Sequence, residues 1–155
     1  MAEPAKNWHS DIAKNRTSKI DYRCVWEKTG EELEFLETPH GELSTIAMFK
    51  DKDGNRGGRQ KGEKYNVDTI SLNDLLKFHN APQEIDYVSI DTEGSELTIL
   101  NAFDFSKHKI KVMTVEHNYT LDREKINKLL DAQGFQHVFP MFSKYDDWYI
   151  HRSAM

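Results

Sequence analysis

The chain of 155 residues lacks several features that mark common classes of protein. It has one cysteine, so an internal disulfide is excluded, and one thiol with seven scattered histidines is a poor basis for a zinc site. No apolar run approaches the roughly 20 residues of a membrane span. The net charge of −5 gives no general attraction to nucleic acid or to an anionic membrane. We therefore expect neither nucleic acid nor a membrane as a partner.

The first six residues, Met-Ala-Glu-Pro-Ala-Lys, lack the apolar stretch of a signal peptide. Together with the lone cysteine, this favours a cytoplasmic location. Hydrophobic residues make up 37% of the chain and aromatic residues 11%, which is enough to build a core, and the length is typical of one domain. We therefore expect a single domain over residues 1–155.

The most informative segment is Ile85-Asp-Tyr-Val-Ser-Ile-Asp-Thr-Glu-Gly-Ser-Glu. An apolar strand pattern runs into a carboxylate cluster and an apolar helix pattern leaves it, at the edge of the sheet where α/β proteins bind ligands. Asp91, Glu93 and Glu96 are therefore candidates to hold a divalent cation, and a carboxylate here could accept a proton. The structural alternative is a helix start, because carboxylates favour the first turn and Thr92 is an ordinary N-cap.

The flanking patterns predict a mixed α/β fold. The strands ending near Asp91 and Glu116 should be adjacent and parallel, because a single crossover helix joins them. Residues 50–64, which mix glycines with charges, are expected to form a mobile loop, and a basic loop of this kind could close over an anionic substrate. The expected helices span 4–15, 93–103 and 121–132, with another opened by residue 71; the expected strands span 20–26, 32–35, 44–49, 85–90, 110–116, 135–139 and 148–151. The last two strands should form an antiparallel hairpin at the sheet edge.

Three segments together resemble the FkbM family of S-adenosylmethionine-dependent methyltransferases. They are Val67-Asp-Thr-Ile-Ser-Leu-Asn-Asp-Leu-Leu, the segment from Ile85 to Glu96, and Val115-Glu-His-Asn. The resemblance covers most of the chain and implies a Rossmann-like sheet with helices on both faces. It also implies transfer of a methyl group from S-adenosylmethionine to a hydroxyl oxygen of a small molecule or glycan.

The resemblance assigns roles to individual residues. Glu3 would hydrogen-bond the ribose hydroxyls of the cofactor, and Cys24 and Val25 would border its adenine. Asp91 would lie beside the methyl donor, and Asp91, Glu93 or His117 could serve as the base that relieves the acceptor of its proton. A divalent cation on Asp91 and Glu93 could instead lower the pKa of the acceptor hydroxyl.

One part of the family pattern is missing, because no Gly-x-Gly-x-Gly precedes Glu3. That turn normally holds the methionine end of the cofactor. We therefore expect an N-terminally truncated version of the sheet, weak cofactor binding, and an oligomer or a complementing chain as partner. Two other functions stay open: a non-catalytic binding or scaffold module derived from the same fold, and a metal-dependent hydrolase that uses the acidic cluster.

Overall fold

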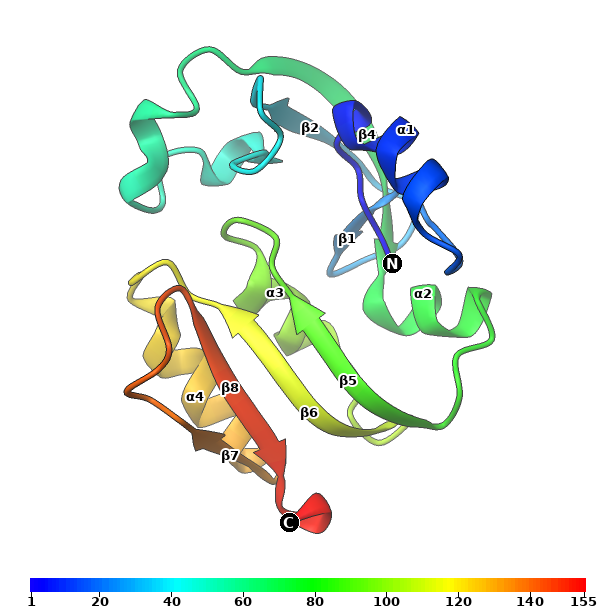
Figure 1. Cartoon of the computed structure of the whole chain (residues 1–155), viewed down its shortest axis with the longest axis vertical. Coiled ribbons are helices and arrows are strands. Elements are labelled where there is room, and N and C mark those ends of the chain that lie inside the picture. The colour runs from blue at the N-terminus through cyan, green and yellow to red at the C-terminus, as the bar shows by residue number, and fades with distance from the viewer.

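The computed structural model describes all residues, 1–155, as a mixed α/β fold with two four-stranded sheets (Figure 1). The first sheet has the order β1-β4-β2-β3 and the second has the order β5-β6-β8-β7. The α/β class agrees with the sequence, and the strands form two separate mixed sheets. Strand β5 is an edge strand of the second sheet, and no strand of the first sheet pairs with it.

The strands of the first sheet are β1 (Cys24–Trp26), β2 (Glu32–Glu37), β3 (Thr45–Ile46) and β4 (Glu63–Ser71). Strand β2 pairs antiparallel with β3, which is shorter than the strand expected over 44–49 because a 3-10 helix, Ala47–Phe49, follows it directly. Strand β4 pairs parallel with β1 and antiparallel with β2. We did not predict β4, because most of its residues are polar and its exposure pattern lacks a regular apolar alternation.

A small core and a helix accompany the first sheet. Helix α1 (Lys6–Asn15) follows an isolated parallel bridge between Ala2 and Asp21, which brings the N-terminal residues beside the segment that leads into β1. A second 3-10 helix, Gly54–Gly57, lies in the segment before β4. The buried side chains of this core are Ala5, Cys24, Trp26, Phe35, Ile46 and Val67.

The second sheet consists of β5 (Glu84–Ile90), β6 (Lys109–Glu116), β7 (Phe135–Val138) and β8 (Asp146–His151). Strands β5 and β6 are adjacent and parallel, which confirms the prediction drawn from the single crossover helix. The terminal hairpin is confirmed as well, since β7 and β8 pair antiparallel. Strand β8 pairs with β6, so β7 forms the edge.

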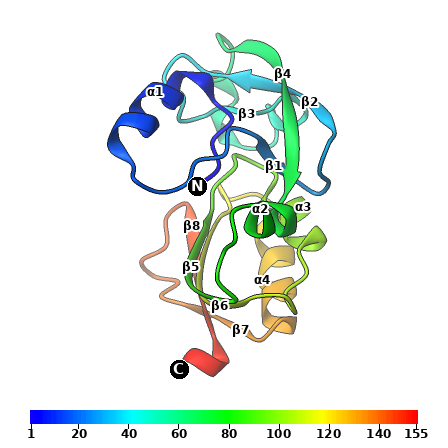
Figure 2. The same ribbon diagram turned by 90° about the vertical axis from the view of Figure 1, so that its right-hand side faces the viewer.

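Helices α3 (Glu96–Ala102) and α4 (Asp122–Ala132) cover one face of the second sheet, and α2 (Leu72–Phe78) lies on the same side (Figure 2). Ser71 caps α2 as predicted, because its hydroxyl accepts a hydrogen bond from the Asp74 amide at 3.1 Å. The buried side chains of this larger core are Leu72, Ile90, Ile99, Leu100, Phe103, Ile110, Met113, Val115, Ile126, Leu130, Phe135 and Tyr149.

The opposite face of the second sheet carries no helix (Figure 2). Tyr149 is buried among the helices, whereas its neighbour Trp148, which points to the other face, is 42% exposed. Tyr87 is 52% exposed. The expectation of helices on both faces is therefore wrong for this sheet. No helix in the structure has the length and apolar character needed to cross a lipid bilayer.

Two methionines test the assignment of the buried core. Met113 on β6 is fully buried, whereas Met141 is 91% exposed. Met113→Ala should lower the free energy of unfolding by about 2–5 kcal/mol, because it removes buried methylene groups and leaves a cavity. Met141→Ala, the matched control, should change it by less than about 0.5 kcal/mol. Urea denaturation measures both, and equal effects would contradict the assigned core.

Candidate active site

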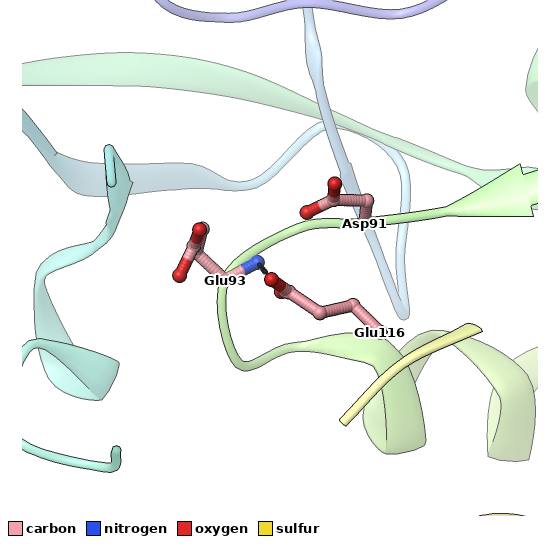
Figure 3. A group of neighbouring side chains, drawn as sticks. All are labelled: Asp91, Glu93 and Glu116. Atoms are coloured by element: carbon pink, nitrogen blue, oxygen red, sulfur yellow. Dashed lines mark hydrogen bonds between the residues drawn. The ribbon is translucent and has the colours of Figure 1, made fainter. Parts of the chain in front are cut away.

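The carboxyl ends of β5 and β6 lie side by side, and each delivers an acidic residue to the same place. Ile90 pairs with Val115 in the parallel register, so Asp91 lies next to Glu116. Glu93 follows in the turn after β5. One carboxylate oxygen from each of Asp91, Glu93 and Glu116 lies within 4.8 Å of the others (Figure 3). The structure thus assembles a three-carboxylate cluster, referred to below as the acidic trio.

Glu96 is not part of this trio, although the sequence suggested it. Its Oε1 accepts hydrogen bonds from the amide and hydroxyl of Thr92, both at 2.9 Å, and from the Gly94 amide at 3.0 Å. It therefore closes the turn between β5 and α3. Helix α3 begins at Glu96 and its N-cap position is Ser95, so the N-cap role considered for Thr92 is wrong.

The turn depends on two residues with left-handed backbone conformations. Glu93 has φ of +57° and Gly94 has φ of +123°. A side chain on Gly94 would place its Cβ only 3.0 Å from the Cβ of Phe49, so glycine is required for both conformation and space. This backbone path directs the Glu93 amide toward Glu116, while the Glu93 side chain faces Arg59.

Glu116 is the most perturbed member of the trio. Burial and, to a smaller extent, the charges of Asp91 and Glu93 together raise its pKa to about 10, which favours the neutral form. Its Oε2 accepts a hydrogen bond from the Glu93 amide at 3.2 Å, and one of its carboxyl oxygens lies within 4.8 Å of oxygens of Asp91 and Glu93. At neutral pH, Glu116 therefore holds a proton.

Asp91 and Glu93 differ in their surroundings. Asp91 is exposed, and partial desolvation together with the nearby charge of Asp146 raises its pKa. Glu93 is buried, and burial raises its pKa to about 7, while Arg59 opposes that shift. One oxygen of Glu93 accepts from Arg59 at 2.7 Å and from Asn118 at 3.1 Å. Asp91 is therefore the trio member most available to a ligand.

A cavity of about 170 Å³ lies beside the trio, between the two sheets. It brings together residues far apart in the sequence, and the candidates Glu3, Cys24, Val25, Asp91 and Glu93 all line it. Its volume is below the roughly 300–1,000 Å³ of typical ligand pockets. The remaining lining residues are Ala2, Pro4, Trp8, Phe35, Gly41, Glu42, Ser44, Ile46 and Thr92.

Glu3 presents a carboxylate to this cavity. Its Oε1 accepts a hydrogen bond from the Ala5 amide at 2.8 Å, and burial raises its pKa. The negative charge of Asp91 contributes to the same shift, which places the two carboxylates in one electrostatic environment. Cys24 is buried and burial raises its thiol pKa to about 12, so it contributes a neutral wall.

His117, another candidate base, does not line the cavity. Its ring is 3% exposed, and Nδ1 accepts a hydrogen bond from the Tyr119 amide at 3.0 Å. The other nitrogen, Nε2, lies 3.6 Å from the Asp147 carboxylate. Burial lowers the pKa of His117, so the ring is neutral. These contacts hold the loop after β6 and leave the ring turned away from the acidic trio.

Sequence reasoning missed two residues of this site. Glu116 was placed at the end of its strand but not counted among the ligands, although the predicted pairing of the two strands implied its proximity to Asp91. Arg59 was assigned to a solvated loop, yet its side chain contacts Glu93. No local pattern identifies a buried arginine among glycines and charges.

The fold and the carboxylates at the ends of parallel strands agree with a methyltransferase, the class to which comparison with family models assigns the chain. Residues 2–148 match the model described as the methyltransferase FkbM domain. The chain therefore belongs to the FkbM methyltransferase family. No curated protein and no solved structure gives a significant match to it.

The raised pKa of Glu116 makes the free energy of unfolding depend on pH. A buried carboxyl with a raised pKa favours folding below its unfolded value of 4.5 and loses that contribution as the pH rises toward 10. Glu116→Gln keeps the hydrogen bonds without an ionisable group. At pH 8 it should therefore raise the free energy of unfolding by about 1–3 kcal/mol, with a smaller gain at pH 5.

Chemical denaturation at the two pH values measures this difference. Glu63→Gln is a control, because Glu63 is exposed at the start of β4 and forms no ion pair. A loss of stability at pH 8, or a gain that is the same at both pH values, would show that Glu116 is ionised in the folded protein.

Proposed function

We propose that the protein transfers a methyl group from S-adenosylmethionine to a hydroxyl oxygen of a small molecule or glycan. The observation that carries this proposal is the single cavity shared by Glu3, Cys24, Val25 and Asp91. A ribose-binding carboxylate, a neutral wall and a reactive carboxylate are the groups that such a reaction needs. Family membership supports the reaction class.

The donor set fits the adenosine end of the cofactor. The free oxygen of Glu3 can accept hydrogen bonds from two vicinal hydroxyls, and Cys24 and Val25 offer a neutral surface to a purine ring. When bound, S-adenosylmethionine supplies an electrophilic methyl group. The cavity is small for a ligand of this size, so we infer that these residues enclose only part of it.

Asp91 is the base in this proposal. Its carboxylate is exposed to the cavity and takes the proton of the acceptor hydroxyl, which makes the oxygen a better nucleophile. Glu116 lies beside Asp91 and is protonated, so it adds no second negative charge next to the base. Glu93 takes no part in the proton transfer, because Arg59 and Asn118 hold its side chain through one carboxylate oxygen.

A divalent cation is an alternative partner of the acidic trio. Oxygen ligands at this spacing suit Mg²⁺ or Mn²⁺, and such an ion could orient the acceptor or lower its pKa. Binding would displace the proton of Glu116, so affinity should increase with pH. A metal-dependent hydrolase would use the same trio, and phosphatase assays with added Mg²⁺ or Mn²⁺ distinguish it from a methyltransferase.

The isolated chain should bind S-adenosylmethionine weakly, with a dissociation constant of hundreds of micromolar. A charge-assisted contact from Glu3 supplies about 1.5–3 kcal/mol, whereas micromolar affinity needs about 8 kcal/mol. Titration calorimetry measures the constant, and Glu3→Gln should weaken binding further. A low-micromolar constant would contradict this estimate, and complete absence of binding would favour the scaffold alternative.

Asp91→Asn should lower methyl transfer at least about 100-fold, because it removes the proton acceptor. The melting temperature should stay the same or rise, since the change also relieves repulsion within the trio. Asp86→Asn is the matched control on the same strand, where the carboxylate side chain is 88% exposed. Release of S-adenosylhomocysteine with a panel of monosaccharides and small alcohols measures activity; unchanged turnover with a lowered melting temperature would assign Asp91 a structural role.

A further inference from the structure

Arg59 is a fully buried guanidinium in the segment before β4. Its side chain is 2% exposed, and every N–H group has an acceptor. Nε donates to the Leu43 carbonyl at 2.9 Å, and Nη1 donates to the Lys50 carbonyl at 3.3 Å and to Asp53 at 2.8 Å. Nη2 donates to Asp53 at 2.9 Å and to Glu93 at 2.7 Å.

This arrangement excludes a role for Arg59 in binding an anionic substrate. A guanidinium has five N–H donors, and the contacts above use all five. Two of its acceptors are carboxylates, Asp53 and Glu93, so its charge is already matched. The planar guanidinium of arginine directs its N–H groups at these acceptors, whereas the ammonium of lysine has only three donors and no fixed fork geometry.

Arg59 is linked to Glu116 through Glu93, which contacts both residues. Arg59 and Asn118 hold the Glu93 side chain, and the Thr45 hydroxyl donates to its carbonyl at 2.8 Å. Its amide donates to Glu116 at 3.2 Å (Figure 3). Glu93 is therefore fixed at three points in a backbone conformation that is uncommon for a residue with a side chain.

Lys52 fixes the same turn from the same segment. Its ammonium donates to the Gly94 carbonyl and forms an ion pair with Asp122 at 2.7 Å. Residues 50–59 thus hold the turn at two successive residues. Arg59 binds the Glu93 carboxylate and Lys52 binds the Gly94 carbonyl. The segment that the sequence marked as a loop reaches the site through these contacts.

We propose that Arg59 is a positioning residue for the acidic trio. By anchoring the Glu93 side chain, it holds the Glu93 amide toward Glu116 and so keeps the Glu116 carboxyl against Asp91. Its effect on the turn is independent of the reaction. Its effect on catalysis rests on the proposed methyl transfer.

Hydrogen exchange of individual amides tests this directly. Arg59→Gln should accelerate exchange of the Glu93 and Gly94 amides at least about tenfold, with much smaller changes for Met113 and Val115 in the core of β6. Arg59→Lys should restore part of the protection, because it retains the charge but loses the fork. Arg56→Gln is the matched control, since Arg56 is 75% exposed, pairs with Asp51, and should leave all four amides unchanged.

Kinetics provide a second readout. If the enzyme transfers methyl groups, Arg59→Gln should lower kcat at least about tenfold with little change in KM, because substrate contacts remain while the trio is misplaced. Unchanged exchange at Glu93 would overturn the proposal, as would equal acceleration in β6, which indicates general destabilisation. If Arg59→Gln does not fold, the same comparison of amide exchange in Arg59→Lys tests the positioning role. If the wild-type protein shows no methyl transfer, the exchange data alone test that role.

Discussion

Repulsion among carboxylates at the ends of β5 and β6 is the constraint on which the rest of the site depends. Three carboxylates within 4.8 Å cannot all remain ionised in a partly desolvated place. The structure resolves the conflict differently for each: Glu116 keeps a proton, Glu93 faces Arg59, and Asp91 stays exposed. The three carboxyl groups therefore differ in charge and in exposure although they lie close together.

The same constraint explains how the two sheets are held together at the site. Their strands are not paired with each other, yet Thr45, Lys52 and Arg59 from the first part of the chain all contact the turn after β5. Buried charges are costly unless they are paired and hydrogen-bonded. Such contacts therefore add little to the free energy of unfolding, but they favour one relative position of the two sheets. The cavity lies where these two parts meet, and its shape depends on their relative position.

Sequence alone predicted the elements whose apolar patterns are strong. Strands β5 and β6, their parallel pairing and the terminal hairpin all follow from such patterns. It named Glu96 as the third carboxylate and left out Glu116, because the path of the turn depends on the left-handed backbone at Glu93.

Strand β4 and the contact of Arg59 with Glu93 were not predicted from the sequence, for a related reason. Both are polar in sequence and acquire their places through distant partners, such as the β2 strand and the Glu93 carboxylate. His117 was assigned from its position at a strand end, but ring direction is set by Tyr119 and Asp147, which no strand pattern reveals. Apolar and polar patterns in a sequence predict helices and strands, but they do not predict tertiary contacts that depend on the direction of a side chain.

The acidic trio also relates the two ligands considered for this site. A sulfonium group and a divalent cation are both positive, so either one beside Asp91 is favoured by the same excess of negative charge. They differ in what they require of Glu116. Direct coordination by the whole trio requires its proton to leave, so cation affinity should keep rising with pH toward about 10, whereas a sulfonium needs only the charge of Asp91. The pH dependence of binding therefore identifies which ligand the geometry serves.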